Sequence, residues 1–168
     1  TAFHGFKCAD TYDSVLSLIE EYSLPLEAVE LIDPSKSIAQ LIVDKKIVAV
    51  CRGSQEVGER ALGNRSILTL PSVKMKDAIN EKVKFREWWR PFAPMVLDSY
   101  MDTLFDITRP EPFMTTVYSV TGDCPESIKG IIHVDSTARL QTVSQSNNPF
   151  IANILDTISS IKLFDNLI

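Results

Sequence analysis

The feature that most constrains the fold is a continuous run of β-favouring apolar residues, Ile47-Val48-Ala49-Val50-Cys51. Such a run is typical of a strand covered on both faces, because a strand with one solvated face alternates apolar and polar side chains. The segment that follows, Gly53 to Arg65, has a glycine at every fifth position. The sequence therefore predicts a buried strand that leads into a turn-rich loop.

Helical and strand patterns alternate along the rest of the chain. Apolar spacing and capping residues predict helices over residues 11–22, 35–44, 75–83 and 150–161, with Ser35 as the N-cap of the second. Shorter apolar runs predict strands over residues 28–32, 67–70, 95–97, 115–120, 130–134 and 140–143. This order indicates an α/β (α+β) protein with an open mixed sheet, in which the late strands also form antiparallel pairs.

Composition and charge narrow the class of ligand. Acidic side chains dominate residues 1–44 (2 basic, 8 acidic) and 91–168 (4 and 9), whereas residues 45–90 are basic (11 and 5). An acidic chain with a basic centre favours a small anionic ligand, and nucleic acid is an unlikely partner because it usually requires a broad basic face. Solvated helix faces would explain the same counts equally well.

Three further observations concern the compartment and extent of the chain. No apolar run approaches the roughly 18 residues of a membrane helix, so we expect no membrane partner. Cys8, Cys51 and Cys124 form no C-x-x-C pair, which fits a reducing cytosol and a cytoplasmic location. The first residues, Thr1 to Lys7, resemble neither a signal peptide nor a methionine start, so we expect a piece of a longer polypeptide.

The glycine-punctuated segment has the G-x-x-x-x-G spacing of a phosphate-binding P-loop at Gly58 and Gly63. It lacks the chemistry, because Asn64 stands where that loop needs lysine and Arg65 where it needs a hydroxyl for magnesium. What remains is a turn-rich segment that presents Arg60, Asn64 and Arg65 to a ligand, or a plain tight connection.

Residues 82–94 combine four cations, four aromatic rings and two prolines. If the segment is extended, Lys84, Arg86, Trp88 and Arg90 point to one side. Cations interleaved with rings can hold a phosphate while a ring stacks on a base. In the alternative reading the rings belong to the core and the cations reach outward.

Residues 130–143 contain two strand-like runs around a polar turn. His133, Arg139 and Gln141 would share a face or converge at that turn. A hydrogen-bonded structural histidine is favoured over a catalytic one for His133. We expect no metal site, because the other histidine, His4, is remote and no ligand cluster is visible.

Taken together, residues 58–68, 76–94 and 133–143 resemble the C-terminal domain of the carbamoyltransferases related to nodulation protein NodU and the antibiotic O-carbamoyltransferases. The resemblance extends from about Ser35 to Pro149. It implies a YrdC-like fold, a twisted open mixed sheet with flanking helices, over residues 35–168. Residues 1–34 would be a leading segment and linker helix from a preceding transferase domain.

The resemblance also implies a function. The domain would bind the small anions carbamoyl phosphate and ATP, with or without Mg²⁺, and form carbamoyl-adenylate. A separate N-terminal domain, which carries a metal site, would pass the carbamoyl group to a hydroxyl acceptor. The matched motifs carry over a catalytic anion-binding set, Arg60, Lys84, Arg90 and Arg139. Substrate- and nucleotide-binding candidates of second rank are Asn64, Arg65, Arg86, His133 and Gln141.

Two departures from the family pattern stand out. The family has Arg-Met where Ser54-Gln55 stand, Phe at Val57 and Pro at Glu59. It also continues past Asn148-Pro149 to a Thr-Ser-Phe-Asn motif, which this chain, ending at Phe164–Ile168, lacks. We therefore expect either a truncated domain or a degenerate protein that has lost the motif. The rival hypothesis is a non-catalytic YrdC-like module that binds nucleotide or RNA, or docks against a partner domain.

Overall fold

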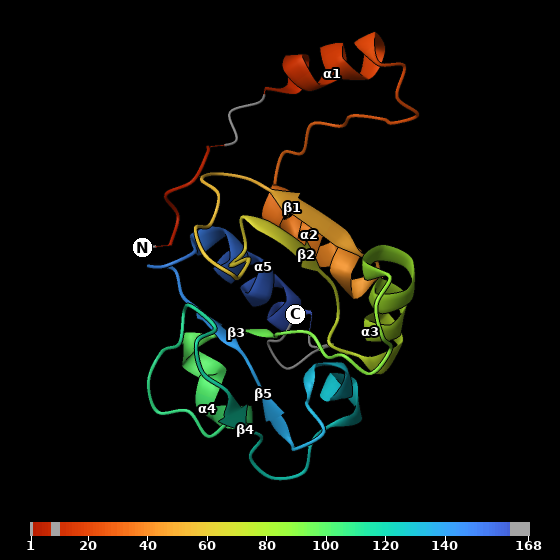
Figure 1. Ribbon diagram of the computed structural model, residues 1–168. Helices are drawn as coiled ribbons and strands as arrows, with labels where there is room; N and C mark the ends of the chain where they lie inside the picture. Colours follow the sequence, from red (N-terminus) through yellow and green to blue (C-terminus); the bar gives the residue numbers. More distant parts are fainter. Residues whose placement is uncertain (1, 8–10, 162–168) are drawn as a thin grey trace.

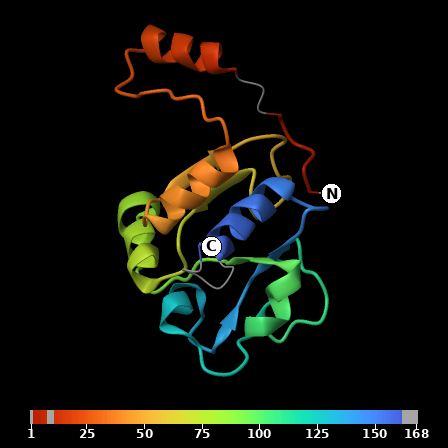
Figure 2. The same ribbon diagram turned by 180° about the vertical axis from the view of Figure 1, so that it is seen from behind.

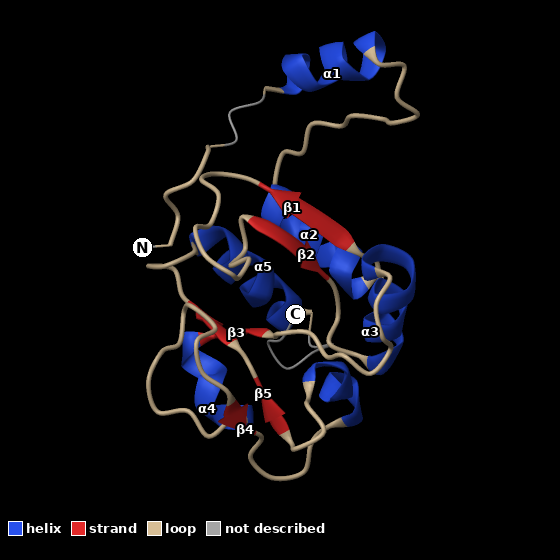
Figure 3. Cartoon of the chain, in the orientation of Figure 1, coloured by secondary structure: helices blue, strands red, loops and turns tan. Residues whose placement is uncertain are grey.

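The computed structural model describes residues 2–7 and 11–161. Cys8 and the expected end of the chain at Phe164–Ile168 lie outside the described residues. Short helices and small sheets joined by long loops make up the body, and one helical segment projects from it (Figures 1 and 3).

The first layer of the body is a hairpin backed by two helices. Strand β1 (Val48–Cys51) pairs antiparallel with β2 (Arg65–Leu68). Helices α2 (Pro34–Val43) and α5 (Pro149–Ser160) pack side by side behind the hairpin, as Figure 2 shows. Each helix starts with proline after a capping side chain, Asp33 for α2 and Asn148 for α5. The larger apolar core lies between these helices and the hairpin.

The second part of the body contains two further strand pairs. Strand β3 (Met95–Leu97) runs parallel to β6 (Gln141–Val143), and β4 (Tyr118–Ser119) pairs antiparallel with β5 (Thr137–Ala138). A smaller apolar core joins Val96 of β3 and the β4–β5 pair to helix α4 (Met101–Leu104) and a 3₁₀ segment, Glu126–Ile131. The remaining residues of β3, Met95 and Leu97, and Val143 of β6 belong to the larger core. Helix α3 (Val73–Ile79) continues into a π-helix, Asn80–Lys84.

The α/β class and the open arrangement of strands are confirmed. The strands pair as three two-stranded sheets, one of them parallel. Several local predictions are wrong. Residues 28–32 are irregular. Residues 130–134 form no strand, because the first two of them end the 3₁₀ segment Glu126–Ile131. Asp33 replaces Ser35 as the cap of α2. Strand β1 is covered on one face only, because it lies in a hairpin that leaves Ala49 and Cys51 exposed.

Residues 12–32, called the arm below, project from the body (Figures 1 and 2). The arm consists of helix α1 (Tyr12–Glu21) and an irregular return segment. No residue of α1 is buried. Helix α1 therefore contributes no residue to the core of the body.

Candidate functional site

A single buried carboxylate organises the glycine-punctuated loop after β1. Glu56 Oε1 accepts the backbone N–H groups of Leu62 (2.7 Å), Asn64 (2.8 Å) and Arg65 (3.3 Å). Burial alone would raise the pKa of Glu56, but the N–H donors outweigh burial and hold this pKa below its ordinary value. The ionised carboxylate therefore fixes the chain on both sides of Arg60.

The same loop is held against α5 and β6. The carbonyl oxygen of Leu62 accepts hydrogen bonds from Gln141 Nε2 (3.1 Å) and Asn148 Nδ2 (3.3 Å). Gly63 has a φ of +109°, and a Cβ there would lie 2.7 Å from Asn148 Nδ2 and 2.8 Å from Ile151 Cγ1. Only glycine combines this backbone conformation with so close an approach.

Two of the candidate ligand-binding side chains hold the loop itself. Arg65 Nη1 donates to the carbonyl oxygens of Arg52 (2.6 Å) and Asn64 (2.9 Å), and Nη2 donates to that of Gly53 (3.4 Å). Asn64 Nδ2 donates to the carbonyl oxygen of Ser54 (2.8 Å). Arg65 and Asn64 therefore position the loop that carries Arg60.

The basic and aromatic segment is looped where an extended chain was expected. The buried Asn80 donates from Nδ2 to the carbonyl oxygens of Arg90 (2.9 Å) and Trp88 (3.3 Å), and its Oδ1 accepts from Arg86 Nε (2.6 Å). The π-helix ends at Phe85, where φ is +49°. The expected alternation of Lys84, Arg86, Trp88 and Arg90 along one side is therefore wrong.

The aromatic rings of this segment are mostly at the surface. Phe85 is 84% exposed, Trp88 72% and Trp89 57%, so the alternative that placed them in the core is wrong for these three. Phe92 is half-buried and has the guanidinium of Arg86 4.2 Å from its ring centroid. Burial and the neighbouring charge of Arg90 lower the pKa of Arg86 from its ordinary value.

Two adjoining cavities lie between these segments, with volumes of about 620 and 580 Å³. Strand β2, two residues of α3 (Lys76 and Ile79), and Lys84 and Arg86 line the first cavity. Residues 57–60 and 113–115 line the second, together with Arg139. Glu59, Arg60 and Met114 line both cavities and form their common wall.

Three cations of the proposed catalytic set line these cavities. Arg60 lines both, Lys84 the first and Arg139 the second. Within the part of the chain that the structure describes, none of the three has a hydrogen-bond or ion-pair partner, and the Nε atom of Arg139 is buried. These three side chains are therefore available to bind an anion, whereas the guanidinium of Arg65 already donates to backbone carbonyl oxygens.

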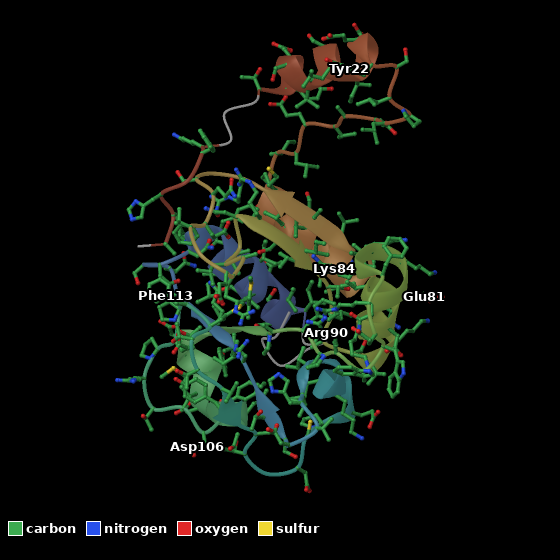
Figure 4. The ribbon with its side chains drawn as sticks, viewed as in Figure 1. Tyr22, Glu81, Lys84, Arg90, Asp106 and Phe113 are labelled. Carbon is green, nitrogen blue, oxygen red and sulfur yellow. The ribbon has the colours of Figure 1, made fainter. Side chains whose placement is uncertain are left out.

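Arg90 differs from the other three cations. Its Nη1 lies 3.6 Å from Glu87 Oε2, its side chain is half exposed, and it lines neither cavity. In Figure 4, Lys84 and Arg90 belong to the body of the protein, far from Tyr22 on the arm. Three of the four cations of the proposed set therefore line the two cavities, which share Arg60, and Arg90 does not join them.

The candidates of the third stretch do not converge. His133 is half-buried, and its Nδ1 lies 2.9 Å from Thr137 Oγ1, which also donates to Asp135 Oδ1 (2.7 Å). This bonding fits the structural histidine that the sequence favours. Gln141 points instead to the carbonyl oxygen of Leu62, and Arg139 lines the second cavity.

Sequence reasoning missed three residues that shape the site: Glu56, Asn80 and Lys76. Glu56 and Asn80 act through bonds to backbone atoms, for which a single sequence carries no spacing signal. Lys76 lines the first cavity, with its Nζ 3.0 Å from Asp77 Oδ1 and 5.5 Å from the Trp88 ring centroid. Its place at the start of the matched block 76–94 was the available signal.

Comparison with known proteins decides the family. The family model for the carbamoyltransferase C-terminus matches residues 39–168. The chain belongs to this carbamoyltransferase family. Nodulation protein U of Rhizobium tropici is 38% identical to it over 133 residues, covering 77% of the chain and 23% of that protein. Nodulation protein NolO of Bradyrhizobium diazoefficiens is 43% identical over 121 residues (70% and 22%). An uncharacterized protein of Methanocaldococcus jannaschii is 43% identical over 123 residues (73% and 24%).

The carbamoyltransferase domain spans only about a quarter of the length of these curated relatives. Among its described residues, no helix is long and apolar enough to cross a membrane. The same residues contain no cluster of three or more His, Cys, Asp and Glu side chains that could hold a metal ion.

Proposed function

We propose that the chain binds carbamoyl phosphate and ATP in its two adjoining cavities and forms carbamoyl-adenylate. A separate N-terminal domain of the transferase polypeptide then passes the carbamoyl group to a hydroxyl acceptor in the cytoplasm. The observation that supports this most strongly is the placement of three cations around two cavities with a common wall. These cations, Arg60, Lys84 and Arg139, have no side-chain partner within residues 2–7 and 11–161. A YrdC-like fold is part of the proposal.

The proposed reaction explains why the common wall carries a cation. Carbamoyl phosphate first loses its phosphoryl group to water, giving carbamate and inorganic phosphate. A carbamate oxygen then attacks the α-phosphorus of ATP, and pyrophosphate leaves. Both substrates are polyanions, so fixed cations must offset their repulsion and the charge of the transition state. Arg60 can face both substrates, and arginine suits phosphate because it donates two parallel hydrogen bonds.

Each cavity suits one substrate. We assign ATP to the first, where Phe92 offers a ring surface and Lys84 a cation for the phosphates. Carbamoyl phosphate takes the second, where the buried Nε of Arg139 lacks an acceptor among the described residues. Glu59, in the common wall, is the one carboxylate among the described residues that lines them. A single carboxylate together with phosphate oxygens suits Mg²⁺, which usually keeps several waters.

Calorimetry with carbamoyl phosphate and with ATP tests these assignments. Arg139→Ala should weaken carbamoyl phosphate binding about tenfold, or roughly 1.4 kcal/mol, and leave ATP binding nearly unchanged. Lys84→Ala should do the reverse, and Arg60→Ala should weaken both. Arg109→Ala is the matched control, because Arg109 is exposed and lines neither cavity. Equal affinities in all variants would defeat the site assignment.

Pyrophosphate release distinguishes the proposed enzyme from the rival hypothesis, a non-catalytic module. The wild-type chain supplied with both substrates should release pyrophosphate, and Arg60→Ala should reduce that release more than Arg90→Ala. Binding of ATP without pyrophosphate release in any condition would favour a non-catalytic nucleotide-binding or docking module.

A further inference from the structure

The arm exposes an unusual amount of apolar surface. Leu18 is 45% exposed, Tyr22 64%, Leu26 63%, Val29 66% and Ile32 105%. Figure 4 shows Tyr22 on this segment, away from the rest of the molecule. Single exposed apolar residues are ordinary, but a run of them along one projecting segment marks an interaction surface.

The arm has a defined shape of its own. Thr11 and Ser14 form a reciprocal capping box at the start of α1. The hydroxyl of Tyr12 donates to the carbonyl oxygen of Ala28 (3.3 Å), which ties the helix to the return segment. The arm is therefore a preformed element, and a partner that bound it would not have to order it from a random chain.

The charge of the arm indicates the chemistry of its partner. Between Lys7 and Lys36 the sequence contains seven acidic residues and no Lys, Arg or His. A surface that is both apolar and uniformly acidic is complementary to an apolar groove with a rim of basic side chains.

The family match indicates where such a groove lies. The match to the family model of the C-terminal domain begins at residue 39, after the arm. The curated relatives are about four times as long as the region that they share with this chain. We propose that the arm, residues 12–32, is a docking element that seats in a basic-rimmed apolar groove of the N-terminal part of the transferase polypeptide. This inference rests on the proposed division of labour between two domains, but not on which ligands the cavities hold.

Protection from proteolysis tests this docking. A glutamate-specific protease can cut the arm after Glu20, Glu21, Glu27 and Glu30. The probe is a fragment that contains the N-terminal three quarters of nodulation protein U from Rhizobium tropici. A control first shows that this fragment binds a second fragment containing the C-terminal quarter of the same protein. In the 168-residue chain alone, the arm should be cut at least tenfold faster than the body. Addition of the probe should slow cleavage of the arm at least tenfold.

Two variants separate docking from other causes of protection. Leu18→Glu with Leu26→Glu should abolish protection by the probe and leave the melting temperature of the body unchanged, because neither leucine is buried against the body. Trp88→Ala, which removes an exposed ring outside the arm, should leave protection intact.

The proposal is overturned if the probe gives no protection, or if the double variant is protected as well as wild type. It is also overturned if the chain alone dimerises through the arm, since the occupant is then a second copy. Calorimetry with carbamoyl phosphate is independent of all these outcomes.

Discussion

Replacement of Gly63 by alanine measures how tightly the Arg60 loop is held against α5. The added Cβ would lie 2.7 Å from Asn148 Nδ2 and 2.8 Å from Ile151 Cγ1. Asn148 cannot easily move away, because its Nδ2 donates to Leu62 and its Oδ1 caps α5 through the N–H of Ile151 (3.2 Å). The substitution therefore forces either a steric clash or the loss of a helix cap.

The expected magnitude has two parts. Alanine at a φ of +109° is strained, which costs about 1–3 kcal/mol. Overpacking against α5 costs about 1–3 kcal/mol more. Gly58→Ala is the matched control, because Gly58 also has a positive φ (+137°) but a Cβ added there would meet nothing within 4 Å. The difference between the two variants therefore isolates the clash, at about 1–3 kcal/mol.

Urea unfolding followed by circular dichroism gives the free energy of unfolding of both variants. For a domain of this size, each kcal/mol corresponds to about 2–4 °C in melting temperature, so thermal melts provide a second readout. Equal destabilisation by Gly63→Ala and Gly58→Ala would refute the close approach of the loop to α5.

Three further results are expected. Because the pKa of Glu56 is held below its ordinary value, its contribution to stability is present above the unfolded-state pKa and is lost as pH falls through the folded-state value. The difference in melting temperature between Glu56→Gln and wild type should therefore become smaller in acid. A difference that does not change with pH would contradict this. Asn80→Ala leaves two carbonyl oxygens and Arg86 Nε without their partner, so unfolding should become easier by about 1–3 kcal/mol, with faster hydrogen exchange confined first to residues 85–91. Gly130→Ala would place a Cβ 2.5 Å from the carbonyl oxygen of Ser72, so its melting temperature should fall by more than that of Gly122→Ala, whose Cβ meets nothing within 4 Å.

The helices were predictable because their start signals are local. Asn148-Pro149 places a capping side chain before a proline at the start of α5. Asp33-Pro34 does the same for α2, two residues before Ser35, the cap expected from the sequence. The strands depend on partners that one sequence does not reveal. Residues 28–32 favour a strand but have no neighbour to pair with among the described residues, whereas residues 130–134 begin where Gly130 donates to the carbonyl oxygen of Pro71 (3.0 Å) and the chain turns.

The candidate site was predictable as a set of residues but not as a division of tasks. Arg60 and Arg65 are five positions apart in the same glycine-punctuated loop, and only the family resemblance, not the residue pattern of the loop, ranked Arg60 above Arg65. The difference arises from where nearby carbonyl oxygens point. Both arginines line the first cavity, but the guanidinium of Arg65 is bonded to several of these oxygens, whereas that of Arg60 has no partner among the described residues. Such backbone directions are set by tertiary contacts such as those of Glu56.

The π-helix at Asn80–Lys84 makes the position of Lys84 depend on chain length as much as on residue type. A π turn holds one residue more than the α turn it replaces. Loss of a single residue here would restore the narrower α turn and rotate Lys84 away from the first cavity, which it now lines. Over evolutionary time this stretch should accept exchanges of exposed side chains far more readily than insertions or deletions.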